Sequence, residues 1–436
     1  MNISEVIPFG KSAKDFYWLT AFEDAFVPQQ RHVNERPLDE YELTQHYRFW
    51  KTDIEKAKNL GIQMLRYGIP WYKVNPAPGK FTWKWVDEVV DYAINTCKLE
   101  LMIDLNHYNA PLWIENEYIN SSFPERQAEY AHAFAERYQK MVHFYNPYNE
   151  PVVNAWFSGE KSEWPPYLHG DDGFVKVLLS LAKTVVLTVN AIREVDPESR
   201  FVHAEGVLRA TTENKNLKEA ASRIQERSSI LYDLVSGRLK EDHQLYSYLT
   251  DNGASERDFS WFQDNRIDLD IIGVNYYPQT SHLVLYLIDS AIETRTVTGG
   301  KQYLEEWFLK YYKKYKRPML LSETSFYGSS EEKALWLEES CSVIKRLRSQ
   351  GIPIIGYTWW AMIDYIGWDY KWGQGGPEEY IGFVHPPERK NPRKAAGLYT
   401  LRPEFDGSLM RQKQPIVDIY ASYIQNSKEK VGYLAL

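Results

Sequence analysis

The chain has 436 residues, a formal net charge of −8 and a pI near 5.8, and its basic residues are dispersed apart from the mixed run "YYKKYKRP". This charge pattern argues against nucleic acid as a partner. Two cysteines exclude a disulfide framework and a four-thiolate metal site. The N-terminal residues lack the basic start and apolar core of a signal peptide, and no run approaches about 18 uninterrupted apolar residues. We therefore expect a soluble, cytoplasmic chain that does not span a membrane.

Eight short apolar runs follow one another along the chain, with charged helical segments between them. Their apolarity is continuous rather than alternating, which is typical of strands buried on both faces. The runs are residues 16–22, 64–69, 99–108, 142–149, 200–206, 270–277, 318–324 and 353–360. The helical segments include residues 47–61, 127–140, 173–195 and 331–351. This alternation predicts an α/β protein, a closed parallel (β/α)₈ (TIM) barrel that forms a single domain over residues 1–436.

The interval between the fifth and sixth runs is longer than the others. Residues 207–269 are about twice what one crossover helix needs. We expect this enlarged region to hold extra helix around "NLKEAASRIQERSSILYDLVSGRL" and a loop at the mouth of the barrel.

Polar side chains are expected at the C-terminal ends of the strands, where barrels of this kind carry their active sites. The fourth run illustrates this, because "YNPYNEPV" ends in an amide and a carboxyl group, and the proline after them cannot continue the ladder. The residues at the ends of runs two to eight are Arg66, His107, Asn149, Glu150, His203, Glu205, Asn275, Tyr277, Glu323, Trp359 and Trp360. Two carboxyl groups, Glu150 and Glu323, thus face each other across part of the barrel.

Most glycoside hydrolases use two carboxyl groups, which flank the glycosidic bond that is broken. One group must be a neutral acid and the other an anion, so their pKa values should be pushed apart. We expect Arg66 to keep Glu323 ionised and Tyr277 to hydrogen-bond to it. Glu150, beside the neutral amide of Asn149, is expected to remain protonated. The chain's 15 Trp and 32 Tyr fit a sugar site, since flat aromatic rings often line such sites, although an aromatic-rich core would need them too.

Several of these residues also have a purely structural interpretation. Glu323 could be the buried ion-pair partner of Arg66, and His107 could be a core histidine with its hydrogen bonds satisfied. His203 and Glu205 are interpreted as structural. Trp359 and Trp360 point to opposite faces of their strand, so one of them packs between barrel and helices.

Six segments, in a fixed order over roughly residues 16–370, resemble the motifs of one enzyme family. They are "LRYGIPWYKVNP" (65–76), "LNHYNAPLW" (105–113), "NEP" (149–151), "GVNYY" (273–277), "SETSFYG" (322–328) and "YTWWAMIDYIGW" (357–368). The family that they resemble is glycoside hydrolase family 1, the β-glucosidase family. Each motif is weak alone, but together they are specific.

The resemblance implies roles for individual residues. It makes Glu150 the general acid/base and Glu323 the nucleophile of a retaining β-glycosidase, with the two carboxyl groups ~5–5.5 Å apart. It also implies a set of residues that bind or support a small-molecule glycoside or oligosaccharide, with Trp360 as the platform under the sugar. That set is Arg66, His107, Asn149, Asn275, Tyr277, Trp360 and Trp368, and Asp364 is a structural support. No metal and no organic cofactor are implied.

The chain departs from the family where the outer hydroxyls of glucose are bound. The family's acidic residue in the eighth segment falls on Gly367, and its strand-one glutamine has no clear counterpart. Phe26 stands near the glutamine position, and Glu23, Gln29 or Gln30 are the candidate substitutes. These departures predict a glycone other than plain glucose: a pentose, a deoxy sugar, or a sugar extended or oxidised at carbon six.

Two other functions compete with hydrolysis. A transglycosidase would use the same intermediate and pass it to an acceptor other than water. A non-catalytic sugar-binding protein could share the barrel, since a fold does not fix a function. Because such proteins typically lose one of the two glutamates and both are present here, the retaining glycosidase is the leading hypothesis.

Overall fold

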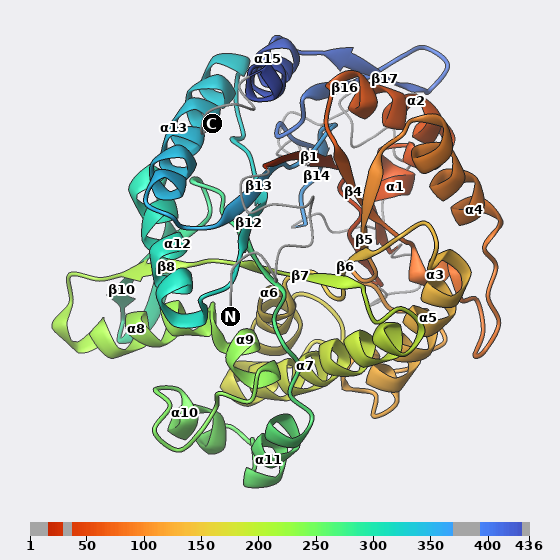
Figure 1. Ribbon diagram of the computed structural model, residues 1–436. Helices are drawn as coiled ribbons and strands as arrows, with labels where there is room; N and C mark the ends of the chain where they lie inside the picture. Colours follow the sequence, from red (N-terminus) through yellow and green to blue (C-terminus); the bar gives the residue numbers. More distant parts are fainter. Residues whose placement is uncertain (1–15, 29–36, 369–392, 430–436) are drawn as a thin grey trace.

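The computed structural model describes residues 16–28, 37–368 and 393–429, and it contains the predicted barrel (Figure 1). Eight parallel strands close in the order β1-β4-β5-β6-β7-β9-β12-β13. Their bounds are β1 Tyr17–Ala21, β4 Met64–Gly68, β5 Glu100–Asp104, β6 Phe144–Asn146, β7 Arg200–Gly206, β9 Ile271–Asn275, β12 Met319–Thr324 and β13 Ile354–Trp359. Every predicted run contributes one strand, so the predicted (β/α)₈ fold is confirmed.

The fourth barrel strand is shorter than the sequence suggests. The apolar run extends to residue 149, but β6 ends at Asn146. Pro147 follows directly, and a proline has no N–H to donate to a neighbouring strand. Asn149 and Glu150 therefore lie in a turn beyond the strand, and not on its last residues.

Helices surround the barrel, as Figure 1 shows. The longer ones are α2 His46–Asn59, α4 Lys84–Asp91, α5 Phe123–Tyr138, α7 Gly170–Val195, α12 Lys301–Tyr315, α13 Ser330–Ser349 and α15 Ile416–Glu429. Three short helices, α1 Glu40–Leu43, α3 Trp71–Val74 and α6 Pro151–Ala155, lie in the loops after strands. Ser329 begins α13 with a capping box, in which its hydroxyl accepts from the N–H of Glu332 and the Glu332 carboxylate accepts from the N–H of Ser329.

Helix α7 is long and apolar enough, by length and composition, to cross a membrane. Its packing explains the apolarity differently, because it lies between α5, α6 and α9, and 61% of its most apolar window is buried inside the molecule. Helices with apolar residues on most of their surface are typical of the core of a large protein.

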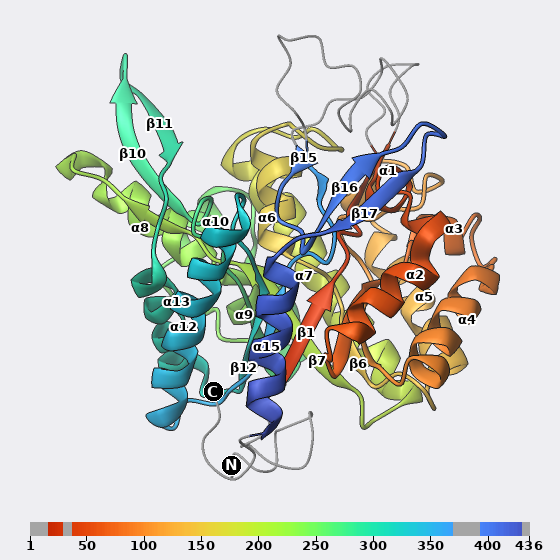
Figure 2. The ribbon, with the colours of Figure 1, turned by 90° about the horizontal axis from the view of Figure 1, so that it is seen from above.

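The enlarged region between the fifth and sixth barrel strands contains the expected extra helix. Its elements are β8 Arg209–Thr211, α8 Lys218–Arg227, α9 Ile230–Val235, α10 Tyr246–Asp251 and α11 Glu256–Asp264. A hairpin of β10 His282–Ile288 and β11 Ala291–Thr296, which the sequence analysis did not predict, pairs with β8. Figure 2 shows this hairpin extending away from the barrel. The segments around the barrel mouth therefore include two insertions on the same side.

Three further strand pairs lie outside the barrel in the described residues. Strand β2 Phe26–Val27 pairs with β3 Leu38–Asp39, β14 Tyr365–Ile366 pairs with β15 Arg393–Lys394, and β16 Tyr399–Pro403 pairs with β17 Leu409–Lys413. Of these pairs, β14–β15 joins the segment after β13 to the C-terminal part of the chain.

The barrel interior is closed by a layer of apolar side chains, one from nearly every strand. The members are Leu19, Met64, Met102, Val202, Ile271, Leu320 and Ile355, with Tyr17 and Phe144 against them. Because this layer fills the barrel with side chains that exclude water, polar groups gather beyond it, at the C-terminal ends of the strands. The candidate site lies there.

Candidate active site

Glu150 is held at the mouth by its backbone. Its N–H donates to the carbonyl of Ala204 on β7 (3.0 Å), and its own carbonyl accepts from Asn154 (3.0 Å) in α6. The residue adopts φ 46° and ψ 58°, a left-handed conformation that is uncommon for a side chain other than glycine. Such backbone strain concentrates at functional sites, and here it turns the Glu150 carboxyl group, which is 4% exposed, into the barrel mouth.

Glu323 lies near the end of β12, where the strand pairing is irregular. The register against β9 shifts between Leu321 and Glu323, and so does the pairing with β13 between Leu321 and Thr324. Bulges of this kind re-aim side chains next to active sites. The Glu323 carboxyl group is 2% exposed and accepts a hydrogen bond from the Tyr277 hydroxyl (2.8 Å).

Arg66 joins the two strand ends through one guanidinium group. Its Nη1 lies 2.8 Å from Oε1 of Glu323, its Nη2 donates to Oδ1 of Asn149 (2.7 Å), and its Nε donates to Asp104 (2.7 Å). It is fully buried. A planar guanidinium with fixed donors positions several acceptors at once, so Arg66 sets where Glu323 and Asn149 lie relative to each other.

Glu150 has different partners. Asn275 donates from Nδ2 to Oε1 of Glu150 (2.9 Å), and the Tyr108 hydroxyl hydrogen-bonds to Oε2. Both donors are neutral. The two carboxyl groups therefore lie in different surroundings, one beside a cation and one beside an amide and a phenol, as the sequence predicted. Tyr108 was not among the predicted site residues.

The pKa of Glu323 differs from the expectation. Burial raises the pKa of this carboxyl to about 8, the neighbouring Glu150 adds to the rise, and Arg66 and His107 oppose it. The expectation that Arg66 keeps Glu323 ionised is therefore wrong for the protein without substrate, because desolvation outweighs the ion pair.

His107 lies between Asn149 and two acidic residues. Its Nδ1 is 2.9 Å from Asp24, its Nε2 faces Nδ2 of Asn149 at 2.9 Å, and Glu23 lies 3.7 Å from Nε2. Although burial lowers it, the carboxylates of Asp24 and Glu23 raise the pKa of His107. His107 is thus not an isolated core histidine. It contacts Asn149, next to Glu150, on one side and the carboxyl groups of Asp24 and Glu23 on the other.

The two adjacent tryptophans separate as expected. Trp359 packs on Tyr420 of α15 and donates to the carbonyl of Ala396 (3.1 Å). Trp360 faces the site, with the Arg66 guanidinium 4.5 Å from its ring centroid and its Nε1 donating to Glu23 (2.8 Å). Trp368 lies over the mouth against Tyr108 and Trp164, with ring centroids 5.1 and 5.7 Å apart.

His203 and Glu205, interpreted as structural, are buried on β7. Glu205 accepts hydrogen bonds from the N–H groups of Val152 (3.0 Å) and Gly206 (2.9 Å), so it supports the start of α6 behind Glu150. Burial lowers the pKa of His203 to about 3, which keeps it neutral. Asp364 also has a supporting place, since it accepts from the N–H of Gly397 (2.9 Å) and from Thr400 (3.0 Å).

The structure distinguishes the candidates for the missing strand-one glutamine. Glu23 lies in the site, where it accepts from Trp360. Phe26 instead stacks on Tyr72, with ring centroids 3.6 Å apart. Gln29 and Gln30 lie outside the described residues. Glu23 is therefore the described residue that occupies this edge.

An acidic side chain also reaches the corner beside Gly367, and the sequence analysis missed it. Glu40, the first residue of α1, accepts from the N–H of Ile366 (3.1 Å) and is fully buried. Its own N–H donates to the carbonyl of Ala25 (3.2 Å), which places α1 against the loop that carries Glu23. The only sequence signal was an acidic residue at the start of a short helix far from the recognised motifs.

Asp24, Asp104 and His107 have ligand atoms within 4.8 Å of one another, a spacing that could hold a metal ion. Each group already has a protein partner, because Arg66 donates to Asp104 and His107 bonds to Asp24. The cluster is therefore explained by ion pairing within the site.

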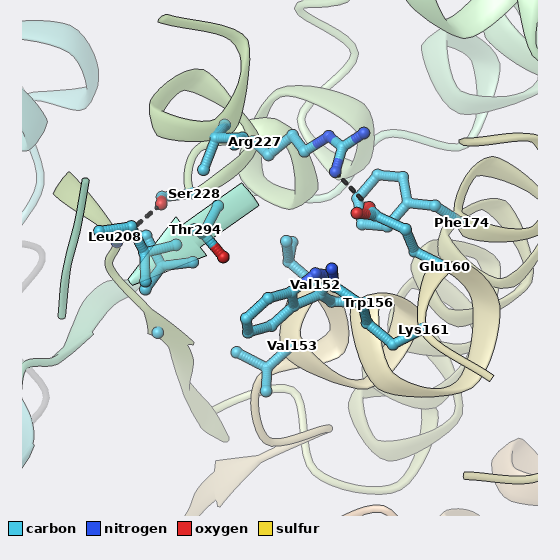
Figure 3. A pocket seen from close by; sticks show the side chains of 13 residues that line it. Val152, Val153, Trp156, Glu160, Lys161, Phe174, Leu208, Arg227, Ser228 and Thr294 are labelled. Carbon is cyan, nitrogen blue, oxygen red and sulfur yellow. Dashed lines mark hydrogen bonds and ion pairs between the residues drawn. The ribbon is translucent and has the colours of Figure 1, made fainter. Parts of the chain in front are cut away.

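Two neighbouring cavities lie on this side of the mouth, and Glu150 lines the larger one. One, of about 360 Å³, opens at the mouth between α6 and residues of the β9, β12 and β13 loops, including Tyr277, Tyr327 and Trp368. A smaller one of about 60 Å³ lies behind Val153 and Trp156, and Figure 3 shows its lining. Val152, Val153, Trp156 and Leu208 make most of this lining apolar, and the Arg227–Glu160 ion pair (2.5 Å) lies at one end. Both cavities share Val153, Trp156, Gly206 and Leu208.

Two carboxyl groups in contrasting surroundings lie at the C-terminal mouth of this (β/α)₈ barrel, beside a buried arginine and a tryptophan platform. This arrangement defines the class of retaining glycoside hydrolases. Residues 20–280, more than half of the chain, match the family model Glycosyl hydrolase family 1. The chain belongs to this family, and the resemblance inferred from its motifs is confirmed.

Curated relatives agree with this membership. The chain is 22% identical to Beta-glucosidase A of Thermotoga maritima over 81% of its own length and 85% of the relative's. It is 21% identical to the aryl-phospho-beta-D-glucosidase BglA of Bacillus subtilis, over 90% and 88% of the two chains. The chain is thus a β-glucosidase-like glycoside hydrolase, and these identities are too low to specify its sugar.

Solved structures show the same fold. A β-glucosidase from Thermotoga maritima in complex with deoxynojirimycin superimposes with a TM-score of 0.77 at 14% identity, covering 95% of this chain and 98% of the other. The glycoside hydrolase family 1 β-glucosidase from Exiguobacterium antarcticum B7 gives 0.76 at 15% identity, over 95% and 98%.

Proposed function

We propose that the protein is a retaining β-glycosidase in which Glu323 is the nucleophile and Glu150 the general acid/base. The contrast between the partners of the two carboxyl groups supports this assignment most strongly. Glu323 contacts a guanidinium and a phenol, which stabilise an anion, whereas Glu150 contacts an amide and a phenol. In this assignment Glu323 attacks as the anion and Glu150 supplies the proton to the leaving oxygen.

In the first step, Glu323 forms a bond to the anomeric carbon while the bond from that carbon to the leaving oxygen breaks. Glu150 gives its proton to that oxygen, so the leaving group departs as an alcohol. In the second step, Glu150 removes a proton from water, the water oxygen bonds to the anomeric carbon, and Glu323 is released as a carboxylate. Two inversions leave the configuration unchanged.

The leaving-group side is mainly apolar and aromatic. The mouth cavity and the smaller cavity behind Trp156 meet at Val153, Trp156 and Leu208. Apolar surfaces of this kind bind aryl or alkyl groups better than free saccharides. We therefore infer an aglycone with an apolar portion. The same apolar surfaces, which exclude water, would also favour an alcohol over water as the acceptor. Transglycosylation is therefore the second candidate reaction.

A panel of aryl β-glycosides tests the proposal. We expect release of the aryl alcohol, faster with larger apolar aglycones, and NMR should show a β-configured sugar as the first product. Adding a simple alcohol during turnover separates the two reactions, because a transglycosidase forms the alkyl glycoside in preference to the free sugar. An α-configured first product, or sugar binding without turnover, would contradict the proposal.

Tyr277→Phe tests the setting of Glu323. The substitution removes the hydroxyl that donates to Oε2 of Glu323 and leaves the ring in place. A hydrogen bond to a charged group is worth ~1.5–3 kcal/mol, so we expect kcat/KM to fall by about tenfold to a hundredfold. Losing a donor to the anion raises the pKa of Glu323 further, so the acidic limb of the pH profile of kcat/KM should move to higher pH.

Tyr276→Phe is the matched control. The Tyr276 hydroxyl donates to the carbonyl of Gly300 (2.9 Å), away from the carboxyl pair. This variant should keep the position of the acidic limb. Equal pH profiles for the two variants would mean that Tyr277 does not act on Glu323.

A further inference from the structure

The edge of the site across Trp360 from Glu323 is lined by carboxyl groups. The Arg66 guanidinium lies over the Trp360 ring and contacts Glu323, while Nε1 of the same indole donates to Glu23. Asp24 and Glu23 flank His107, and Glu40 joins them from α1. A sugar that lies on Trp360 with its anomeric carbon at Glu323 therefore presents its far edge, carbons three, four and six, to this acidic edge.

Glu40 is the least compensated member of the acidic edge. Its Oε2 accepts one hydrogen bond from the N–H of Ile366, and its Oε1 is buried without a hydrogen-bond partner among the described residues. Burial raises the pKa of Glu40 well above its usual range, and Glu23 adds to the rise. A buried carboxyl oxygen without a donor is costly, so a donor from a ligand would stabilise it.

Several other buried carboxyl groups in the described chain have a cation or two backbone donors, as Glu205 has in the N–H groups of Val152 and Gly206. Asp53 is paired with Arg411 (2.8 Å), Asp233 with Lys314 (2.5 Å), and Asp39, next to Glu40, lies 3.5 Å from Lys73. In contrast, Glu23 and Asp24 share His107, and Glu40 accepts one hydrogen bond, from the N–H of Ile366. Removing the partner of a buried charge is strongly destabilising, so an unpaired edge indicates that its cation comes from elsewhere.

The site as a whole contains more carboxyl groups than basic groups. Six carboxyl groups gather there, while the basic groups in contact with them are Arg66 and His107. The six are Glu23, Asp24, Glu40, Asp104, Glu150 and Glu323. Arg66 is already committed to Asp104 and Glu323. A cluster of buried carboxyl groups with few basic partners favours a ligand that brings hydrogen-bond donors and a positive charge.

Resting on the proposed function, we infer that the natural glycone is an amino sugar whose ammonium group, on carbon three, four or six, binds to Glu23, Asp24 and Glu40. An ammonium group offers three donors and one positive charge, which match several carboxyl acceptors that have few donors of their own. A hydroxyl group offers one donor and no charge. A glycone oxidised to a carboxylate at carbon six would be repelled, so this inference removes that option from those the sequence left open.

Aryl β-glycosides of 3-, 4- and 6-amino-deoxy sugars, compared with their hydroxyl parents, test the inference. At a pH where the amine is protonated, we expect at least one amino glycoside to exceed its parent in kcat/KM by about tenfold or more, as one additional charge-assisted hydrogen bond provides. The N-acetyl derivative of the preferred substrate keeps the nitrogen and removes the charge. It should lose the advantage.

The variant Glu40→Gln keeps the shape of the side chain and removes its charge. We expect the ratio of kcat/KM for the amino glycoside to that for its parent to fall by about tenfold. Glu42→Gln is the matched control, because Glu42 lies on the same short helix but is exposed. It should leave the ratio unchanged. Since both numbers in a ratio come from the same protein sample, partial misfolding does not produce the expected result.

Binding provides a second measurement that is independent of turnover. Calorimetric titration of the Glu323→Gln protein with the free amino sugar and with its hydroxyl parent should show tighter binding of the amino sugar. Preference for the parent sugar in every pair, or an unchanged ratio in Glu40→Gln, would overturn the inference. So would activity that chelators remove and a divalent cation restores, because the edge would then be a metal site. The absence of hydrolysis on every glycoside would instead count against the proposed function.

Discussion

Glu323→Gln is expected to abolish turnover of every glycoside, with kcat falling by about 10⁵-fold or more, as for other enzymes that lose their nucleophile. The amide cannot form the covalent glycosyl intermediate, and no other carboxyl group is positioned by Arg66 and Tyr277 in its place. The measurement is the initial rate on an activated aryl glycoside, with thermal unfolding recorded for the same sample. Glutamine keeps the shape of the side chain, and Asp104 remains as a carboxylate partner of the buried Arg66, so the fold should survive the change.

Glu205→Gln is the control for this variant. Glu205 is also a buried carboxyl group near the end of a barrel strand, but it accepts hydrogen bonds from Val152 and Gly206. Burial raises its pKa well above the usual range, so a neutral amide resembles its native state. We expect this variant to keep most of the activity. If Glu323→Gln kept comparable activity, Glu323 would be a structural partner of Arg66 and not the nucleophile.

The barrel could be predicted because each strand is apolar on both faces. One apolar side chain from nearly every strand forms the layer that closes the barrel, and the helices cover the outside. The exact strand ends and the β10–β11 hairpin could not be predicted in this way. Pro147 ends β6 before its apolar run ends. In the hairpin, β11 is exposed along its whole length and β10 pairs with β8 outside the barrel, so the hairpin depends on local pairing.

The catalytic side of the site was predictable for a related reason. Residues at the ends of neighbouring parallel strands must converge, and Glu150, Asn275, Glu323 and Arg66 do so. Tyr108 was missed although it is the last residue of the predicted run 99–108, because β5 ends at Asp104 and leaves Tyr108 in the loop after the strand, with a left-handed backbone (φ 61°). Glu40 was missed because only the packing of α1 on the carbonyl of Ala25 brings it to the site.

The protonation of the carboxyl pair was the least predictable feature. From the sequence, Arg66 is expected to keep Glu323 ionised, and the structure contains an ion pair between these two residues. The sequence cannot reveal how deeply Glu323 is buried, and this burial raises the pKa of its carboxyl group to about 8. A raised carboxyl pKa also lowers stability as pH increases, because the unfolded chain gives up this proton near its ordinary pKa while the folded protein retains it up to about pH 8.

Glu150→Ala is expected to separate glycosides by their leaving groups. An aryl glycoside with an acidic leaving alcohol needs little protonation, so formation of the intermediate should be nearly unaffected, and the intermediate should accumulate because water lacks its base. Glycosides with poor leaving groups should lose ~10²–10⁴-fold in kcat/KM. Rapid-mixing measurements would show a burst of aryl alcohol followed by a slow steady state.

Adding azide to the Glu150→Ala variant tests the acid/base role of Glu150 directly. An anionic nucleophile needs no base, and the shortened side chain leaves room beside Asn275 and Tyr108, which contact Glu150 in the native protein. Azide should therefore restore the steady-state rate on activated substrates, and the product should be the β-glycosyl azide, since it forms by a second inversion at the anomeric carbon. An α-glycosyl azide would mean that azide attacked the substrate directly in the position of a nucleophile. Equal loss on good and poor leaving groups, without rescue, would remove Glu150 from the acid/base role while leaving Glu323 as the candidate nucleophile.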